Sequence, residues 1–108
     1  MTISYSETFR EFRKAQDEID RIVAQLESFS GRLKRFPAET CFTSVPGEPE
    51  PPLDQFLGGA RWVSESFPTP VEIQSAIRRR HFAKVRLHEI WAQMNGHERS
   101  QMPAPPKD

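Results

Sequence analysis

Apolar residues recur every seven positions through the first third of the chain, and this spacing constrains the fold more than any other feature. The repeat consists of Phe12, Ile19, Leu26 and Leu33. Residues seven apart lie on nearly the same side of an α-helix, so the repeat forms one apolar stripe. A strict seven-residue repeat also favours packing against a neighbouring helix. Because no proline occurs before Pro37, the sequence predicts one long amphipathic helix within residues 1–36.

A second long helix is predicted over residues 70–96, where the boundary signals are clear. Thr69 is a favoured N-cap residue, Pro70 suits the first helical position, and Glu72 completes a capping box. Asn95 and Gly96 are typical of a helix end. At about 100° per residue the apolar side chains gather on one face. This face consists of Ile73, Ala76, Ile77, Leu87, Ile90, Trp91 and Met94.

The connection between these helices, residues 37–69, is acidic and rich in proline. Closely spaced prolines predict that residues 37–52 form no regular structure. They are Pro46, Pro49, Pro51 and Pro52. Residues 53–67 carry more apolar side chains than a free linker needs, so we expect them to lie across the helices and close the core. Their local structure is either short helical turns or a short extended piece.

These elements predict an all-α fold, with the two long helices packed as an antiparallel hairpin and the Pro-rich connection folding back over them. A chain of 108 residues has room for one small domain. Residues 97–108 contain three prolines and are predicted to be a mobile tail. Only 36% of the residues are hydrophobic, so the chain is expected to complete its core with a partner or with another copy of itself.

A basic stretch in the second helix has two interpretations. Its cations are Arg78, Arg79, Arg80, Lys84 and Arg86. On a helical wheel Arg80 and Lys84 lie near the middle of the apolar face, where their methylene stems could cover apolar surface and their charges reach acidic partners. Phe82 and Val85 lie on the outer side, between the other arginines. That side suits a protein partner, or alternatively phosphates with Phe82 stacked on a base.

The sequence does not predict catalysis, a cofactor or a metal. His81 and His88 are two helical turns apart, roughly 10.5 Å along the axis, too far for one metal ion. Cys41 is the only cysteine, and no base is placed beside it to make it a nucleophile. A single cysteine, an N-terminus without an apolar signal region and the lack of a long apolar run predict a soluble, cytoplasmic protein.

The function predicted from these patterns is that of a non-enzymatic interaction or assembly protein, which binds other protein through helix faces, as a homo-oligomer or a subunit. The expected contact residues are Phe12, Ile19, Leu26, Leu33, Trp62, Arg78, Phe82, Val85 and Arg86. The alternative is a nucleic-acid-associated protein that uses Arg78, Arg79, Arg80, Lys84 and Arg86. A zero net charge argues against a dedicated nucleic-acid binder. An enzyme ranks third.

Overall fold

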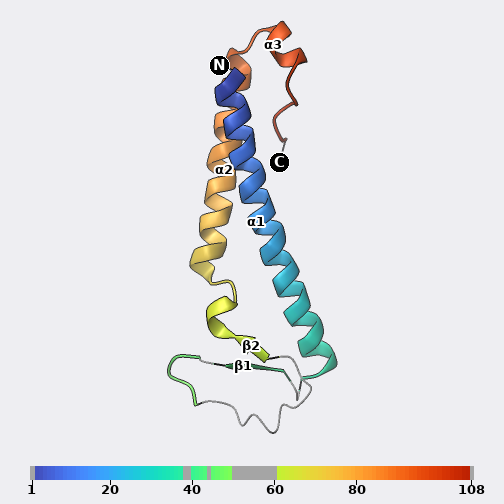
Figure 1. Ribbon diagram of the computed structural model, residues 1–108, viewed down its shortest axis with the longest axis vertical. Helices are drawn as coiled ribbons and strands as arrows, with labels where there is room; N and C mark the ends of the chain where they lie inside the picture. Colours follow the sequence, from blue (N-terminus) through green and yellow to red (C-terminus); the bar gives the residue numbers. More distant parts are fainter. Residues whose placement is uncertain (1, 38–39, 44, 50–60, 108) are drawn as a thin grey trace. The chain divides into compact units, whose positions relative to one another are not determined.

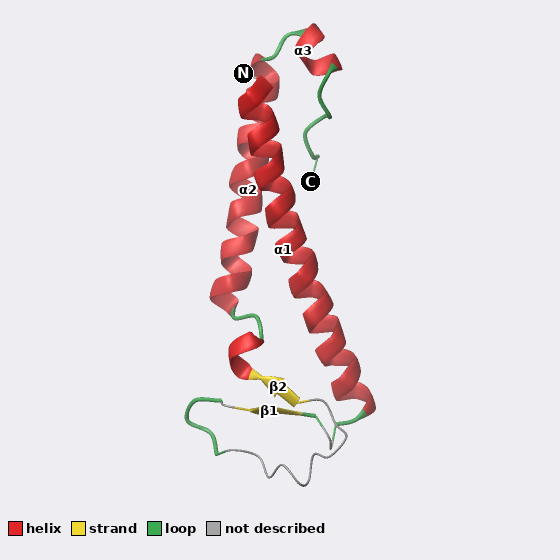
Figure 2. Ribbon diagram, viewed as in Figure 1, coloured by secondary structure: helices red, strands yellow, loops and turns green. Residues whose placement is uncertain are grey.

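The fold is described from a computed structural model, which covers residues 1–108 and describes residues 2–37, 40–43, 45–49 and 61–107 (Figure 1). The chain is mostly helical, at 72%. Figure 2 shows its helices and its single short strand pair within the described residues. The elements in chain order are α1 (Thr2–Arg35), β1 (Cys41–Thr43), β2 (Arg61–Val63), the 3-10 turn η2 (Ser64–Ser66), α2 (Pro70–Gln93) and α3 (Gly96–Ser100).

The chain divides into two compact units. Unit 1 consists of residues 1–20 and 71–108, and unit 2 consists of residues 21–70. The helix α1 contributes its first part to unit 1 and its remainder to unit 2. The two long predicted helices are present, since α1 ends at Arg35 and α2 begins at Pro70. The two helices pack against each other.

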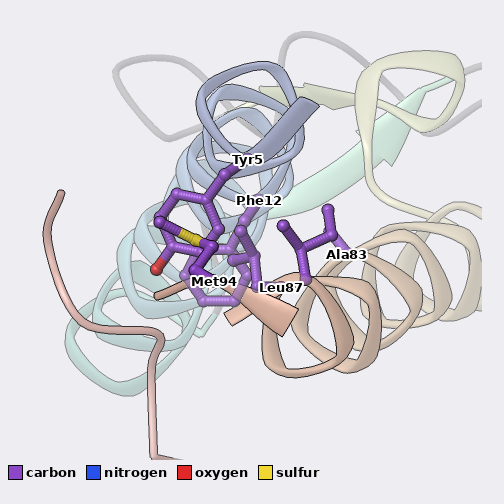
Figure 3. Packing of buried hydrophobic residues seen from close by; sticks show 6 residues of the cluster. Tyr5, Phe12, Ala83, Leu87 and Met94 are labelled. Carbon is purple, nitrogen blue, oxygen red and sulfur yellow. The ribbon is translucent and has the colours of Figure 1, made fainter. Parts of the chain in front are cut away.

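The core of unit 1 lies between the first part of α1 and the middle and end of α2. Its buried side chains are Tyr5, Phe12, Ala83, Leu87, Ile90 and Met94, with Phe9, Trp91 and Met102 packed at its edge. Figure 3 shows this cluster between the helices, with Tyr5, Phe12, Ala83, Leu87 and Met94 labelled. Tyr5 and Leu87 are fully buried. Burial of such apolar surface stabilises this pairing of α1 with α2.

The buried face of α2 differs from the predicted one by a fraction of a turn. Ala76 and Ala83 are both buried, and the seam continues from them through Leu87 and Ile90. Small side chains allow a neighbouring helix to approach closely, so the contact line follows the alanines rather than the largest apolar residues. Ile77, which the sequence places on the core face, is consequently 46% exposed. The prediction for Ile77 is therefore wrong.

After α2 the chain turns back along unit 1 (Figure 1). Asn95 does not simply end α2: its side chain accepts a hydrogen bond from the amide of Glu98, and the Glu98 carboxylate accepts one from the Asn95 amide. This capping box starts α3. The sequence predicts a mobile tail at residues 97–108, whereas the described part of this segment forms α3 and packs onto both long helices through Met102, Pro103 and Pro106.

Unit 2 contains a small strand pair, which corrects the prediction of a purely α-helical fold. The strands β1 and β2 are parallel, with Phe42 opposite Trp62 and Thr43 opposite Val63. Residues 37–52 were expected to have no regular structure, but Cys41–Thr43 contain no proline and carry a β-favouring aromatic and threonine. The extended option for the segment around residues 60–64 is the one that β2 adopts. Leu53, Phe56 and Leu57 lie outside the described residues.

An aromatic cluster joins the strand pair to α1 within unit 2. Phe29 of α1 lies 4.9 Å from Phe42, 5.4 Å from Trp62 and 5.1 Å from Phe67, measured between ring centroids. The pairs of Phe29 with Trp62 and Phe67 are edge-to-face, and such pairs contribute about 0.5–1.5 kcal/mol each beyond burial. The Thr40 hydroxyl also donates to the carbonyl of Phe36, just after α1. The connection is therefore anchored to α1 by packing at Phe42, Trp62 and Phe67.

Candidate protein-interaction surfaces

The side of α2 away from the core carries a mixed apolar and basic surface, here called the outer patch and defined by Arg78, Phe82, Val85 and Arg86. Phe82 is 63% exposed and Val85 is 40% exposed. Both arginines are exposed as well. At 100° per residue Phe82 lies roughly 140° from the buried Leu87. The predicted contact residues of this helix are thus together on one accessible side.

A groove runs beside the outer patch, along the seam of α1 and α2 in unit 1. Its volume is about 420 Å³. The residues that line it are Thr8, Glu11, Lys14, Ala15, Arg79, Phe82, Ala83 and Arg86. The alanines and Thr8 are buried and form its floor, while three cations and one carboxylate stand around it. The arrangement suits an apolar side chain with acidic neighbours.

The basic stretch is divided between the inside and the outside of unit 1. Arg80 is partly buried: its guanidinium lies 4.8 Å from the ring centroid of Phe12, and its Nε donates to Oε1 of Gln16 at 2.5 Å. Gln16 in turn donates to Oδ1 of Asp20 at 2.9 Å. Arg80 therefore covers apolar surface, in agreement with the first interpretation of the basic stretch. Its charge contacts Gln16, which is in turn hydrogen-bonded to the Asp20 carboxylate.

The other cations of this stretch have different surroundings. Lys84 is partly buried, whereas Arg78, Arg79 and Arg86 are exposed. The Nε of Arg79 donates to the Ser75 carbonyl one turn earlier in the same helix, at 3.3 Å. The five cations predicted as an alternative phosphate-binding set therefore do not share one surface. The three exposed arginines are the part of that set that remains available.

The apolar stripe of α1 has different surroundings in its two parts. Phe12 is buried in the core of unit 1. It therefore does not lie on an external surface, although the sequence predicts it as a contact residue. Ile19 is partly buried, whereas Leu26 is 37% exposed and Leu33 is 44% exposed. Within α1 the available members of the predicted set are consequently Leu26 and Leu33, with Ile19 at the border of unit 1.

Trp62, predicted as an interface anchor, contributes its ring to the aromatic cluster of unit 2. It lies 5.4 Å from Phe29 and 6.3 Å from Phe67. The indole ring is partly exposed, but its Nε1 is buried and has no hydrogen-bond partner among the described residues. Trp62 is thus used at least in part for the internal packing of the connection.

The sequence did not predict the contacts of Tyr5, near the start of α1, with the C-terminal segment of unit 1. The Tyr5 hydroxyl donates to the Pro103 carbonyl at 2.6 Å, and burial of the side chain raises the pKa of Tyr5. A signal was present, since Tyr5 precedes Phe12 by seven residues and extends the apolar repeat. Arg99 also donates to the Trp91 carbonyl at 3.0 Å, with its guanidinium 5.5 Å from the Trp91 ring centroid. No periodic pattern in the sequence predicts these tail contacts.

Comparison with known proteins adds no functional information at this point. No protein-family model, no characterised protein and no solved structure matches the chain. Within the described residues, no helix is both long and apolar enough to cross a membrane. The same residues contain no group of three or more His, Cys, Asp or Glu side chains that could hold a metal ion. The surfaces above are therefore judged by their own chemistry.

Proposed function

We propose that the chain is a non-enzymatic assembly protein that binds other protein through its helix faces. The observation that carries this proposal is the outer patch, where Phe82 is 63% exposed between arginines. Arginine is enriched at the energetic centres of protein interfaces, and phenylalanine is enriched in interfaces relative to the rest of the surface. A phenylalanine held on a rigid helix also loses little conformational freedom when a partner covers it. These features favour protein binding over a purely solvated surface.

Two details of the fold belong to the same proposal. We place α1 and α2 in an antiparallel hairpin, because Tyr5 near the start of α1 lies 5.7 Å from Trp91 near the end of α2. Gln16, further along α1, bonds to Arg80, which is earlier in α2. We also propose that the Pro-rich connection folds back on the helices, a placement supported by the contacts of Phe42 and Trp62 with Phe29.

The partner we favour is a second copy of the chain, or a larger helical assembly, in the cytoplasm. Leu26 and Leu33 leave apolar surface on α1, and their seven-residue spacing suits a neighbouring helix. A four-helix arrangement would cover this stripe. The single cysteine, Cys41, is free and partly buried, which fits a reducing compartment.

The test is the mass of the protein in solution, measured by analytical ultracentrifugation over a wide range of concentration. We expect a mass that rises with concentration for the natural chain, and loss of the larger species in Phe82→Glu and in Leu26→Asp. Gln74→Glu and Ala24→Asp are the matched controls, because Gln74 and Ala24 are exposed on the same helices and are not among the predicted contact residues. A chain that stays monomeric at every concentration would rule out self-association.

A nucleic-acid-associated role is the second candidate, because Arg78, Arg79 and Arg86 are exposed. Phosphate binding predicts retention on a heparin column that decreases as salt is raised. It also predicts that Arg79→Glu combined with Arg86→Glu abolishes retention. The Arg80→Gln variant should change retention little, since Arg80 is engaged with Phe12 and Gln16. A chain that elutes without retention would exclude this candidate and leave the protein-binding role.

A further inference from the structure

The C-terminal segment of the chain is held against unit 1 by two side chains that bind its backbone. The hydroxyl of Tyr5, on α1, donates to the Pro103 carbonyl at 2.6 Å. The Nε2 of His88, on α2, lies 2.7 Å from the Pro106 carbonyl. Because a carbonyl can only accept, His88 donates through Nε2. Two helices thus supply two donors to one short stretch of prolines.

These two carbonyls are three residues apart in the sequence, which is the repeat length of an extended proline helix. Pro103 and Pro106 are three residues apart, in the sequence Pro-Ala-Pro-Pro. A polyproline II helix repeats every three residues and leaves its carbonyls without internal partners. Proline has no backbone N–H, so its carbonyl is the only main-chain group that a binding site can recognise. Two hydrogen-bond donors that bind carbonyls three residues apart therefore suit a peptide in the polyproline II conformation.

The side chains around Tyr5, which binds this segment, have the aromatic character of proline-binding sites. The Tyr5 ring lies 5.7 Å from Trp91 and 6.0 Å from Phe9, between centroids. Proline-rich peptides dock on aromatic surfaces of this kind because their extended helix is preformed and loses little entropy. Met102, just before the first proline, packs against the core of unit 1. Pro103 and Ala104 are exposed, while Pro105 and Pro106 are partly buried, so the segment lies at the surface.

We propose that Tyr5, Phe9, His88 and Trp91 form a binding site for an extended Pro-x-Pro-Pro peptide. The chain's own residues 103–106 occupy this site as a resident ligand, and a proline-rich segment of a partner protein exchanges with them. The proposal goes beyond the assembly role above, since it uses none of the residues of the outer patch. The two proposals can fail separately.

A hollow beside Pro103 could accept a side chain of the partner peptide, and its lining indicates the charge of that side chain. Its volume is about 310 Å³. It is lined by Tyr5, Ser6, Phe9, Arg10, Arg13, Met102 and Pro103. The guanidinium of Arg13 lies 4.8 Å from the Phe9 ring centroid, which holds a positive charge at the aromatic floor. An acidic residue directly before the first proline would place its carboxylate near Arg10 and Arg13, a pairing that Met102 does not make.

The experiment uses full-length protein and a fluorescent peptide followed by anisotropy. The probe is Pro-Gly-Glu-Pro-Glu-Pro-Pro-Leu, the sequence of residues 46–53, which has the same Pro-x-Pro-Pro spacing with a glutamate ahead of it. The receptor is a variant with a loosened tail, made by changing Pro103, Pro105 and Pro106 to glycine. A resident segment that is docked nine-tenths of the time lowers the apparent affinity for a competitor about tenfold. We therefore expect the loosened variant to bind the probe about tenfold more tightly than the natural chain.

Point variants in the loosened background test the two donors. Tyr5→Phe removes only the hydroxyl, and the loss of one hydrogen bond weakens binding roughly fivefold. His88→Ala should weaken binding to a similar degree, while His81→Ala, an exposed histidine on the same helix, should leave it unchanged. A probe with alanine in place of its prolines should not bind. Changing both probe glutamates to glutamine should weaken binding, and Arg10→Ser with Arg13→Ser should remove that difference.

Three results would overturn the proposal, each obtained with variants whose helical circular dichroism matches the natural chain. The first is no binding of the probe to the loosened variant. The second is equal binding by Tyr5→Phe, His88→Ala and the His81→Ala control. The third is equal affinity of the natural and loosened chains, which would show that residues 103–106 do not occupy the site. If the triple proline variant loses its helical signal, Pro106→Gly alone takes its place.

Discussion

The position of the helix seam in unit 1 can be tested with two core substitutions on α2. The sequence places Ile77 and Leu87 on the same apolar face, whereas the structure leaves Ile77 46% exposed and buries Leu87 completely. We expect Leu87→Ala to be much more destabilising than Ile77→Ala. Both substitutions remove three carbon atoms from an aliphatic side chain, so their different surroundings are what the comparison measures.

The expected magnitudes follow from burial. At about 0.8 kcal/mol per buried CH₂ group, the Leu87 truncation loses about 2.4 kcal/mol of transfer free energy. The cavity left against Tyr5, Phe12 and Ile90 raises the cost to about 3–4 kcal/mol. Ile77 keeps much of its contact with water, and the solvent fills its place, so Ile77→Ala should cost about 1 kcal/mol. The total free energy of unfolding of a small protein is only about 5–15 kcal/mol, so the cost of Leu87→Ala is a large part of it.

The assay is urea unfolding followed by helical circular dichroism, which gives the free energy of unfolding of each variant. Val71→Ala serves as a control, because Val71 is exposed near the start of α2 and should change the free energy by less than about 0.5 kcal/mol. Equal costs for Ile77→Ala and Leu87→Ala would refute the placement of the seam along the two alanines. They would restore the wider apolar face that the sequence predicts.

Two further predictions concern Arg80 and Tyr5. Replacing Arg80 with methionine keeps apolar cover over Phe12 but removes the cation and its hydrogen bond to Gln16. This substitution should lower the free energy of unfolding in urea by about 1–2 kcal/mol. A loss no larger than that of the exposed Arg79→Met would contradict this account. Burial raises the pKa of Tyr5 above 10.0, so this contribution to stability is complete below pH 10 and is lost as the pH rises further, when the unfolded tyrosine ionises first. Because Tyr5 is the only tyrosine, absorbance at 295 nm follows it alone, and a midpoint at or below 10 in the folded protein would be inconsistent with its burial.

The candidate surfaces were only partly predictable from sequence. The exposed group around Phe82 was predicted correctly as an outer side of its helix, because Phe82 and Val85 are out of phase with the apolar face. Phe12 was assigned to an interface because its repeat continues beyond one helix partner. Periodicity shows which side of a helix is apolar, but it does not show how far along the helix the chain's own core extends. For this reason the repeat could not distinguish Phe12, which is buried, from Leu26 and Leu33, which are exposed.

The amino-acid sequence by itself determined the two long helices of this protein, because their signals are local. The seven-residue repeat set the apolar side of α1, and Thr69-Pro70 marked where α2 begins. The tertiary structure alone decided which residues from different segments meet: Gln16 with Arg80, Phe29 with Phe42 and Trp62, and Tyr5 with Pro103. The partners in each pair are separated in the chain, and within unit 1 their geometry depends on how closely small residues such as Ala83 let α1 and α2 approach. Local propensities do not encode contacts between distant segments. The docked prolines and the strand pair could therefore not be predicted from the sequence.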